Sequence, residues 1–366
     1  MQIDPALFEE NERTAPKQDA RRIFEIGDLK TETGGEITNA KIAVETWGEL
    51  NEARDNAILV CHALSGDSHA IGWWDRIVGP GRVIDTDKYF VIGTNCLGGC
   101  QGSSGPGSLD ENGRRLGTRF PMITVGDMVE AQSRVLDQLG VEQLLMACGG
   151  SMGGMQALEW SLRFPTRVRK CWMTASCHAH SAMQIGFNEA GRQAIYRDPN
   201  WQDGDFDEIP AHGLSVARMV GHLSYLSDAS FQAKFGRGLQ KKERLEFLAG
   251  VEYQVESYLS YQGDKFTQRF DAGSYVVLTK AIDWFERTDW SASQAEYLFT
   301  SYTSDWLYPS HQSATLLELA RGHQRPAEWH DIDLPYGHDA FLLDGEIQAG
   351  FVREFLAGQP ASKDQA

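Results

Sequence analysis

Residues 144–158 read LLMACGGSMGGMQAL, an apolar run followed by a cluster of glycines and then by residues that favour a helix. The pattern G-x-S-x-G lies within it as Gly149, Ser151 and Gly153. A serine on a tight turn between a strand and a helix presents its hydroxyl at the helix N-terminus, where backbone N–H groups stabilise negative charge. The alternative is a glycine-rich turn with an incidental serine. The strand and helix patterns on its two sides favour a nucleophile at Ser151.

Further apolar runs recur along the chain outside this stretch. They lie at residues 56–64, 89–95, 168–175 and 295–302. Such runs are typical of strands that are buried on both faces of a parallel sheet. Residues 22–50 predict two antiparallel strands joined by a turn at Gly34-Gly35, and residues 124–140 predict an amphipathic helix that stops at Gly140. Strands that alternate with helices predict an α/β fold with a doubly wound, mostly parallel sheet and helices on both faces.

The pattern changes between residues 177 and 294, where helix-forming and aromatic residues dominate and no buried strand is evident. This stretch predicts a helical insertion that covers the sheet as a lid. Residues 21–176 and 295–366 then form the core, and residues 1–20 form a polar N-terminal arm.

A serine hydroxyl is a poor nucleophile near neutral pH, so it needs a base and the base needs an orienting acid. In the α/β-hydrolase fold the three follow in the order serine, acid, histidine. Asp305 comes directly after the predicted strand 295–302, and His338 lies in a glycine-containing loop after a further predicted strand. Alone, Asp305 is equally explained as a helix N-cap and His338 as a solvated loop histidine. Together, in this order and at strand ends, they predict a triad of Ser151, Asp305 and His338.

An oxyanion hole needs two backbone donors near the nucleophile. The N–H of Met152, the residue after Ser151, is one. The loop at residues 62–67, after the predicted strand 56–64, is in the expected place for the other, although a simple turn also explains its Ser, Gly and Asp content.

The net charge of −17 excludes a general affinity for nucleic acids or anionic membranes, because both repel an acidic protein. No apolar run of membrane-spanning length occurs, and the first residues are acidic where a secretory signal is apolar. We therefore expect a cytoplasmic protein. Its six cysteines are expected to be free thiols, and no metal site is expected, since Cys96 and Cys100 have no second ligand pair nearby.

Taken together, five motifs resemble the homoserine O-acetyltransferase family. They are CHALSGDSH at 61–69, GSMGGMQ at 150–156, GLSVARM at 213–219 with HLSY at 222–225, SDW at 304–306, and GHDAF at 337–341. Each motif is shared with other hydrolases, but the set is specific, and the resemblance extends from about Phe24 to Leu356.

The resemblance implies transfer of an acetyl group from the co-substrate acetyl-CoA to the hydroxyl of L-homoserine, in methionine biosynthesis, by a ping-pong route through acetyl-Ser151. It assigns the oxyanion donors to Leu64 and Met152. It places Arg218 on the substrate carboxylate and Asp339 on the substrate ammonium, as their charges suit. It further implies a homodimer joined through lid helices, no bound cofactor, and a lid that excludes water from the acyl-enzyme.

Some alternatives stay open at this point. Relatives that use succinyl-CoA often carry arginine two positions after the acid, and the uncharged Leu307 at this position favours acetyl. L-serine is one methylene shorter than homoserine, and no residue discriminates the two. The competing functions are a serine or homoserine O-succinyltransferase, a serine O-acetyltransferase, a plain esterase or hydrolase, and a non-catalytic binding protein.

Overall fold

The computed structural model describes residues 20–240, 250 and 252–358, so all but the last residue of the predicted N-terminal arm lies outside them. Its main sheet has eight strands in the order β1-β2-β6-β3-β7-β8-β9-β10. The strands are β1 (Arg22–Lys30), β2 (Glu36–Trp47), β3 (Ala57–Cys61), β6 (Phe90–Thr94), β7 (Leu144–Gly150), β8 (Val168–Thr174), β9 (Glu296–Tyr302) and β10 (Ala327–Ile332). The pairs β1–β2 and β2–β6 are antiparallel and the others are parallel. The predicted α/β fold, with its antiparallel opening, is confirmed.

The central strands are buried because their side chains feed two cores, one on each face of the sheet. In β3, Leu59 and Cys61 belong to one buried cluster, and Ile58 and Val60 belong to the other. Side chains of a strand alternate between the two faces, so an unbroken apolar run fills both cores. A separate two-stranded sheet, β4 (Val78–Gly79) with β5 (Ile84–Asp85), was not predicted.

Helices cover both faces of the main sheet. On one face lie α2 (Val125–Gln138), α3 (Met152–Arg163) and α9 (Ser310–Gly322), whose side chains share the cluster of Leu59. On the other face lie α1 (Ala70–Trp73), α10 (Ala340–Leu343) and α11 (Ile347–Ala357). The predicted helix at 124–140 is confirmed as α2. It begins with a capping box between Thr124 and Asp127, and Gly140 beyond its end has a φ of +71°.

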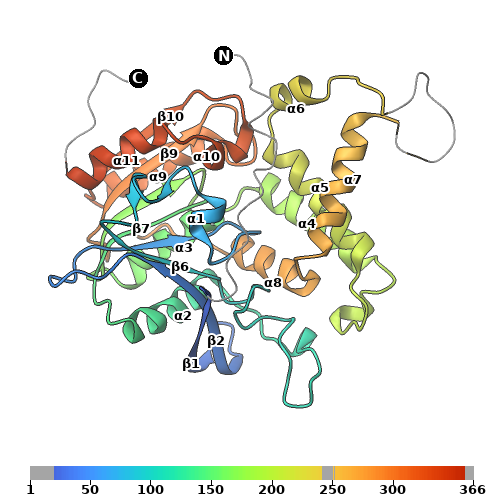
Figure 1. Cartoon of the computed structure of the whole chain (residues 1–366), viewed down its shortest axis with the longest axis horizontal. Helices are drawn as coiled ribbons and strands as arrows, with labels where there is room; N and C mark the ends of the chain where they lie inside the picture. The colour runs from blue at the N-terminus through green and yellow to red at the C-terminus, as the bar shows by residue number, and fades with distance from the viewer. Residues whose placement is uncertain (1–19, 241–249, 251, 359–366) are drawn as a thin grey trace.

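The chain between β8 and β9 contributes helices to the structure. They are α4 (Ala182–Tyr196), α5 (Ala211–Tyr225), α6 (Asp228–Lys234), α7 (Gln254–Thr267) and α8 (Ala272–Asp283). In Figure 1, α4 to α7 form a group beside the sheet at the right of the view, and α8 lies nearer the sheet. Short 3₁₀ turns at Gly117–Arg119, Gln202–Gly204 and Gly337–Asp339 complete the elements. Within the described part of the chain, no helix has both the length and the apolar character needed to span a membrane.

Candidate active site

Ser151 lies on the turn between β7 and α3 in a strained conformation, with φ 55° and ψ −125°. This backbone region is costly for a residue with a side chain, and such strain is concentrated at functional sites. The turn is possible because its neighbours are glycines. A Cβ on Gly149 would lie 2.5 Å from the carbonyl oxygen of Cys61 at the end of β3, and a Cβ on Gly153 would overlap the same oxygen. The glycines therefore let β3, β7 and α3 approach closely and leave the serine at the tip of the turn.

His338 and Asp305 form a buried pair at the carboxyl ends of β10 and β9. Nδ1 of His338 donates to Oδ2 of Asp305 over 2.7 Å, and the two residues are 4% and 3% exposed. The other carboxylate oxygen of Asp305 accepts from the backbone N–H groups of Leu307 and Tyr308, at 3.0 and 2.8 Å. A carboxylate only accepts hydrogen bonds, so the imidazole carries its proton on Nδ1 and Nε2 is left as the basic nitrogen.

Aromatic rings fix the plane of the His338 imidazole. Tyr308 stacks on it with ring centroids 4.8 Å apart and planes 18° apart, and Phe341 meets it edge-on at 5.5 Å. The loop that carries His338 starts at Gly337, which has a φ of +72° and whose N–H donates to Oγ of Ser304. Stacking and a hydrogen-bonded loop together hold the ring in one orientation.

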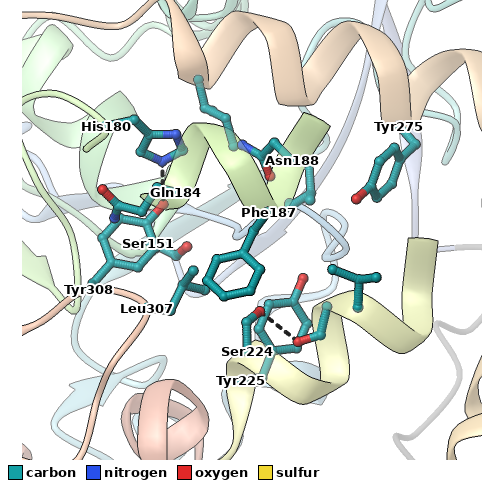
Figure 2. Close-up of a pocket in the computed structure, with 14 residues that line it drawn as sticks. Ser151, His180, Gln184, Phe187, Asn188, Ser224, Tyr225, Tyr275, Leu307 and Tyr308 are labelled. Atoms are coloured by element: carbon teal, nitrogen blue, oxygen red, sulfur yellow. Dashed lines mark hydrogen bonds between the residues drawn. The ribbon is translucent and has the colours of Figure 1, made fainter. Parts of the chain in front are cut away.

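Ser151 opens onto a pocket whose lining comes from the core loops and from the inserted helices (Figure 2). The lining residues are Leu64, Ser151, His180, Gln184, Phe187, Asn188, Val220, Gly221, Ser224, Tyr225, Tyr275, Ile282, Leu307 and Tyr308. Ser151 is itself only 9% exposed. The hydroxyl of Ser151 therefore faces a space bounded by α4, α5 and α8.

The loop after β3 is held by His62. The N–H of Cys96 donates to Nε2 of His62 over 2.9 Å, so the proton of the neutral ring lies on Nδ1, which donates to the carbonyl oxygen of Ala63 over 2.7 Å. The carbonyl and the next N–H of a trans peptide point in opposite directions. By fixing the Ala63 carbonyl, His62 thus sets the direction of the Leu64 N–H, and Leu64 lines the pocket beside Ser151.

The buried position of His62 predicts a pH dependence of stability. Burial is the largest cause that lowers the pKa of His62 below its ordinary value. Below about pH 6.5, His62 therefore binds a proton in the unfolded chain but not in the folded protein. The free energy of unfolding is highest above that pH and decreases as the pH falls below it. In urea unfolding between pH 7 and pH 5, the wild type is expected to lose about 1.4 kcal/mol more per pH unit than His62→Gln. His212→Gln, at an exposed histidine, is the control, and equal slopes for the wild type and His62→Gln would contradict this account.

The residues placed on the substrate by resemblance lie around Tyr225 at the end of α5. Burial raises the pKa of Tyr225, the charge of Arg218 lowers it, and the charge of Asp339 raises it further. Arg218 donates to Oγ of Ser65 over 3.3 Å, and its guanidinium lies 4.8 Å from the centre of the Phe266 ring. Tyr225 lines the pocket, whereas Arg218 and Asp339 are not among its lining residues. Leu307 lines the pocket directly, and Met152 begins α3 next to Ser151.

Among the described residues, no group of three or more His, Cys, Asp or Glu side chains is placed so that it could hold a metal ion. The six cysteines are free thiols. Burial raises the pKa of Cys100 to about 11 and that of Cys177 to about 12. A protonated thiol is a weak ligand and a weak nucleophile, so these groups behave as small apolar side chains.

A second polar group in the pocket was not predicted. His180, which precedes α4, lies between Asp283 at the end of α8 and the hydroxyl of Tyr308. These contacts join residues 103 and 128 positions apart, and nothing in the local sequence of His180 indicates them. Only the fold brings them together.

A strained serine between a strand and a helix, followed in the chain by an Asp–His pair at later strand ends, is the arrangement typical of enzymes with the α/β-hydrolase fold. A family model described as alpha/beta hydrolase fold matches residues 56–344. A homoserine O-acetyltransferase of Solidesulfovibrio magneticus is 46% identical over 364 residues, with 92% of each chain covered. The chain belongs to the homoserine O-acetyltransferase family.

Solved structures show the same architecture. The homoserine O-acetyltransferase of Bacillus anthracis matches with a TM-score of 0.87 at 25% identity, and the match covers 93% of this chain and 98% of that one. Esterase E22 matches with a TM-score of 0.85 at 26% identity, and the match covers 92% of this chain and 99% of that one. Similar backbones thus occur in a transferase and in a hydrolase.

Proposed function

We propose that this protein transfers an acetyl group from acetyl-CoA to the side-chain hydroxyl of L-homoserine, through an acetyl ester on Ser151. Two observations carry the proposal: Ser151 lies on a strained turn between a strand and a helix, and His338 and Asp305 form a buried hydrogen-bonded pair at the ends of later strands. The relatives named homoserine O-acetyltransferase support the two substrates. The product is an activated homoserine for methionine biosynthesis.

In the first half-reaction, Oγ of Ser151 attacks the thioester carbonyl carbon while Nε2 of His338 takes its proton. The negative charge on the carbonyl oxygen is stabilised by the N–H groups of Leu64 and Met152, the first directed by His62 and the second at the start of α3. The tetrahedral intermediate collapses, the carbon–sulfur bond breaks, and His338 returns the proton to the departing CoA sulfur. Asp305 stabilises the imidazolium in between.

In the second half-reaction the hydroxyl of homoserine attacks the acetyl carbon and His338 removes its proton. The bond to Ser151 then breaks, and His338 protonates the released serine. Arg218 pairs with the carboxylate of homoserine and Asp339 with its ammonium, so the hydroxyl is held toward the ester. The uncharged Leu307 favours an acetyl group, because a succinyl group would bring a second carboxylate to an apolar wall of the pocket.

The inserted helices act as the lid in this proposal. Helices α4, α5 and α8 line the pocket and keep water from the acetyl ester, which water would otherwise hydrolyse. Exposed apolar side chains on α5 and α7 support a homodimer through the lid, since Val216, Leu223 and Tyr261 are 45%, 45% and 58% exposed. The free cysteines suit a reducing compartment, and we place the reaction in the cytoplasm.

Mass spectrometry of the intact protein mixed with acetyl-CoA alone tests the proposal. An acetyl adduct on Ser151 is expected in the wild type, L-homoserine is expected to discharge it, and Ser151→Ala is expected to carry none. Parallel reactions with succinyl-CoA and with L-serine identify the preferred donor and acceptor.

A hydrolase is the second candidate function, because the backbone of esterase E22 is so similar. It predicts fast release of CoA from acetyl-CoA in the absence of any amino acid, with little stimulation by homoserine. A stable acetyl adduct that only homoserine discharges would exclude it.

Arg218 offers a prediction on the acceptor alone. Arg218→Gln removes the charge that pairs with the homoserine carboxylate, and the KM for homoserine is expected to rise by about 10- to 100-fold. The rate of adduct formation from acetyl-CoA alone is expected to stay within about twofold of the wild type, because Arg218 acts after acylation in this scheme. Steady-state and single-turnover kinetics measure the two effects. A loss confined to adduct formation would contradict the assignment.

A further inference from the structure

A second histidine–carboxylate pair, His180 with Asp283, lies beside the pocket that Ser151 lines. Nδ1 of His180 lies 2.9 Å from Oδ1 of Asp283, and their side chains are 2% and 8% exposed. Asp283 also accepts from Asn188 and from Arg192, each at 2.7 Å, so its charge is balanced by a guanidinium. Because the carboxylate only accepts, the proton of His180 lies on Nδ1. In its neutral form the ring therefore presents a lone pair at Nε2.

That lone pair faces Tyr308. The hydroxyl of Tyr308 lies 2.7 Å from Nε2 of His180, a contact drawn as a dashed line in Figure 2. Because Nε2 of the neutral ring carries no proton, the hydroxyl donates to it. Burial raises the pKa of Tyr308 well above its ordinary value, so the hydroxyl keeps its single proton, while a side-chain hydrogen bond with Ser151 lowers that pKa. With its proton given to His180, the Tyr308 oxygen can only accept from the Ser151 hydroxyl. That hydroxyl turns from Tyr308 to Nε2 of His338 when Oγ attacks the acyl donor.

We propose that His180, held by Asp283, is a positioning residue that directs the Tyr308 proton away from Ser151 and leaves the lone pairs of Oγ free to attack the acyl donor. This inference rests on the proposed acetylation of Ser151. Tyr308 also stacks on the His338 imidazole, so one side chain touches both the nucleophile's hydroxyl and its base.

The two half-reactions respond in opposite ways to a donor at Oγ. A hydrogen bond donated to Oγ of the free serine stabilises the lone pair that must attack, so acylation slows. In the acetyl-enzyme the same donor would meet the oxygen that departs from the acetyl carbon and gains negative charge, so discharge does not slow. Without His180, the Tyr308 hydroxyl is free to donate to Ser151. The rate of acylation is then expected to fall while the rate of discharge does not.

The test compares His180→Phe, Tyr308→Phe and the double variant with the wild type, with His212→Phe at an exposed histidine as control. Each protein is mixed rapidly with acetyl-CoA, and the acetyl adduct is followed by mass spectrometry. Its discharge by L-homoserine is then timed separately. His180→Phe is expected to acylate about tenfold more slowly, as the energy of one hydrogen bond allows, with no slower discharge.

The double variant decides the matter, because it removes the released donor together with His180. It is expected to acylate faster than His180→Phe alone. A double variant as slow as or slower than the single one would overturn the proposal, as would an equal slowing of both half-reactions. His180→Asn, made in parallel and checked for folding by circular dichroism, is expected to show the same split if His180→Phe does not fold. Absence of any adduct in the wild type would instead defeat the proposed function.

Discussion

Replacing Ser151 by alanine is expected to lower kcat for acetyl transfer by about 10⁶-fold, and His338→Ala by a similar factor. The two side chains act as a unit, because the hydroxyl is a poor nucleophile without the base and the base has no proton to take without the hydroxyl. Asp305→Asn is expected to cost about 10⁴-fold, since asparagine can donate to Nδ1 and so stabilise the wrong tautomer of His338. The ranking follows from the 2.7 Å contact between Nδ1 and Oδ2.

Transfer from acetyl-CoA to homoserine, followed as released CoA thiol, measures these losses. His311→Ala, at an exposed histidine of α9, is the matched control and is expected to retain full activity. Combining Ser151→Ala with His338→Ala is expected to add little to either single loss, because residues that act as a unit are not additive. Near-normal turnover in His338→Ala or Asp305→Asn would refute the triad.

Gly153→Ala is expected to destabilise the fold by about 3 kcal/mol, the upper range for overpacking. The added Cβ would overlap the carbonyl oxygen of Cys61 and lie 2.9 Å from its carbonyl carbon, so β3 and α3 would have to separate. Backbone atoms cannot turn aside as a flexible side chain does. The change also displaces the residue that leads into the Leu64 loop, so activity is expected to fall with stability.

The midpoint of urea unfolding measures this effect, and Gly186→Ala provides the control. Gly186 lies in α4 with nothing within 4 Å of an added Cβ, and alanine favours a helix over glycine by about 1 kcal/mol. The control is therefore expected to gain stability slightly. A Gly153→Ala protein as stable as the wild type would show that β3 and α3 can part without loss.

The turn at Ser151 was predictable because its causes are local. An apolar strand, small residues at the close approach to Cys61, and a helix-forming run all lie within residues 144–158. Asp305 and His338 were predictable from chain order and from their places after strands β9 and β10. The sequence pattern also predicted the central strands of the main sheet. Both faces of these strands are buried, so their residues form unbroken apolar runs that stand out in the sequence.

Other parts of the site depend on contacts that no local pattern reports. His180, Asp283 and Tyr308 come from separate segments, and only the path of the inserted helices brings them together. His62 bonds the carbonyl of Ala63, but its tautomer is set by the N–H of Cys96 from another loop. Arg218 and Asp339 were suggested only by family resemblance and remain proposals.

The order of the triad along the chain has a consequence for synthesis on the ribosome. Ser151 is translated long before His338, and at typical elongation rates the interval is roughly 10–40 s. During that time a nascent chain that has already formed β3 and β7 carries a nucleophile without its base. Because the last strands supply both Asp305 and His338, the proposed reaction is not expected on such a chain, and reactivity is expected to appear only after β10 and the loop that follows it have been made.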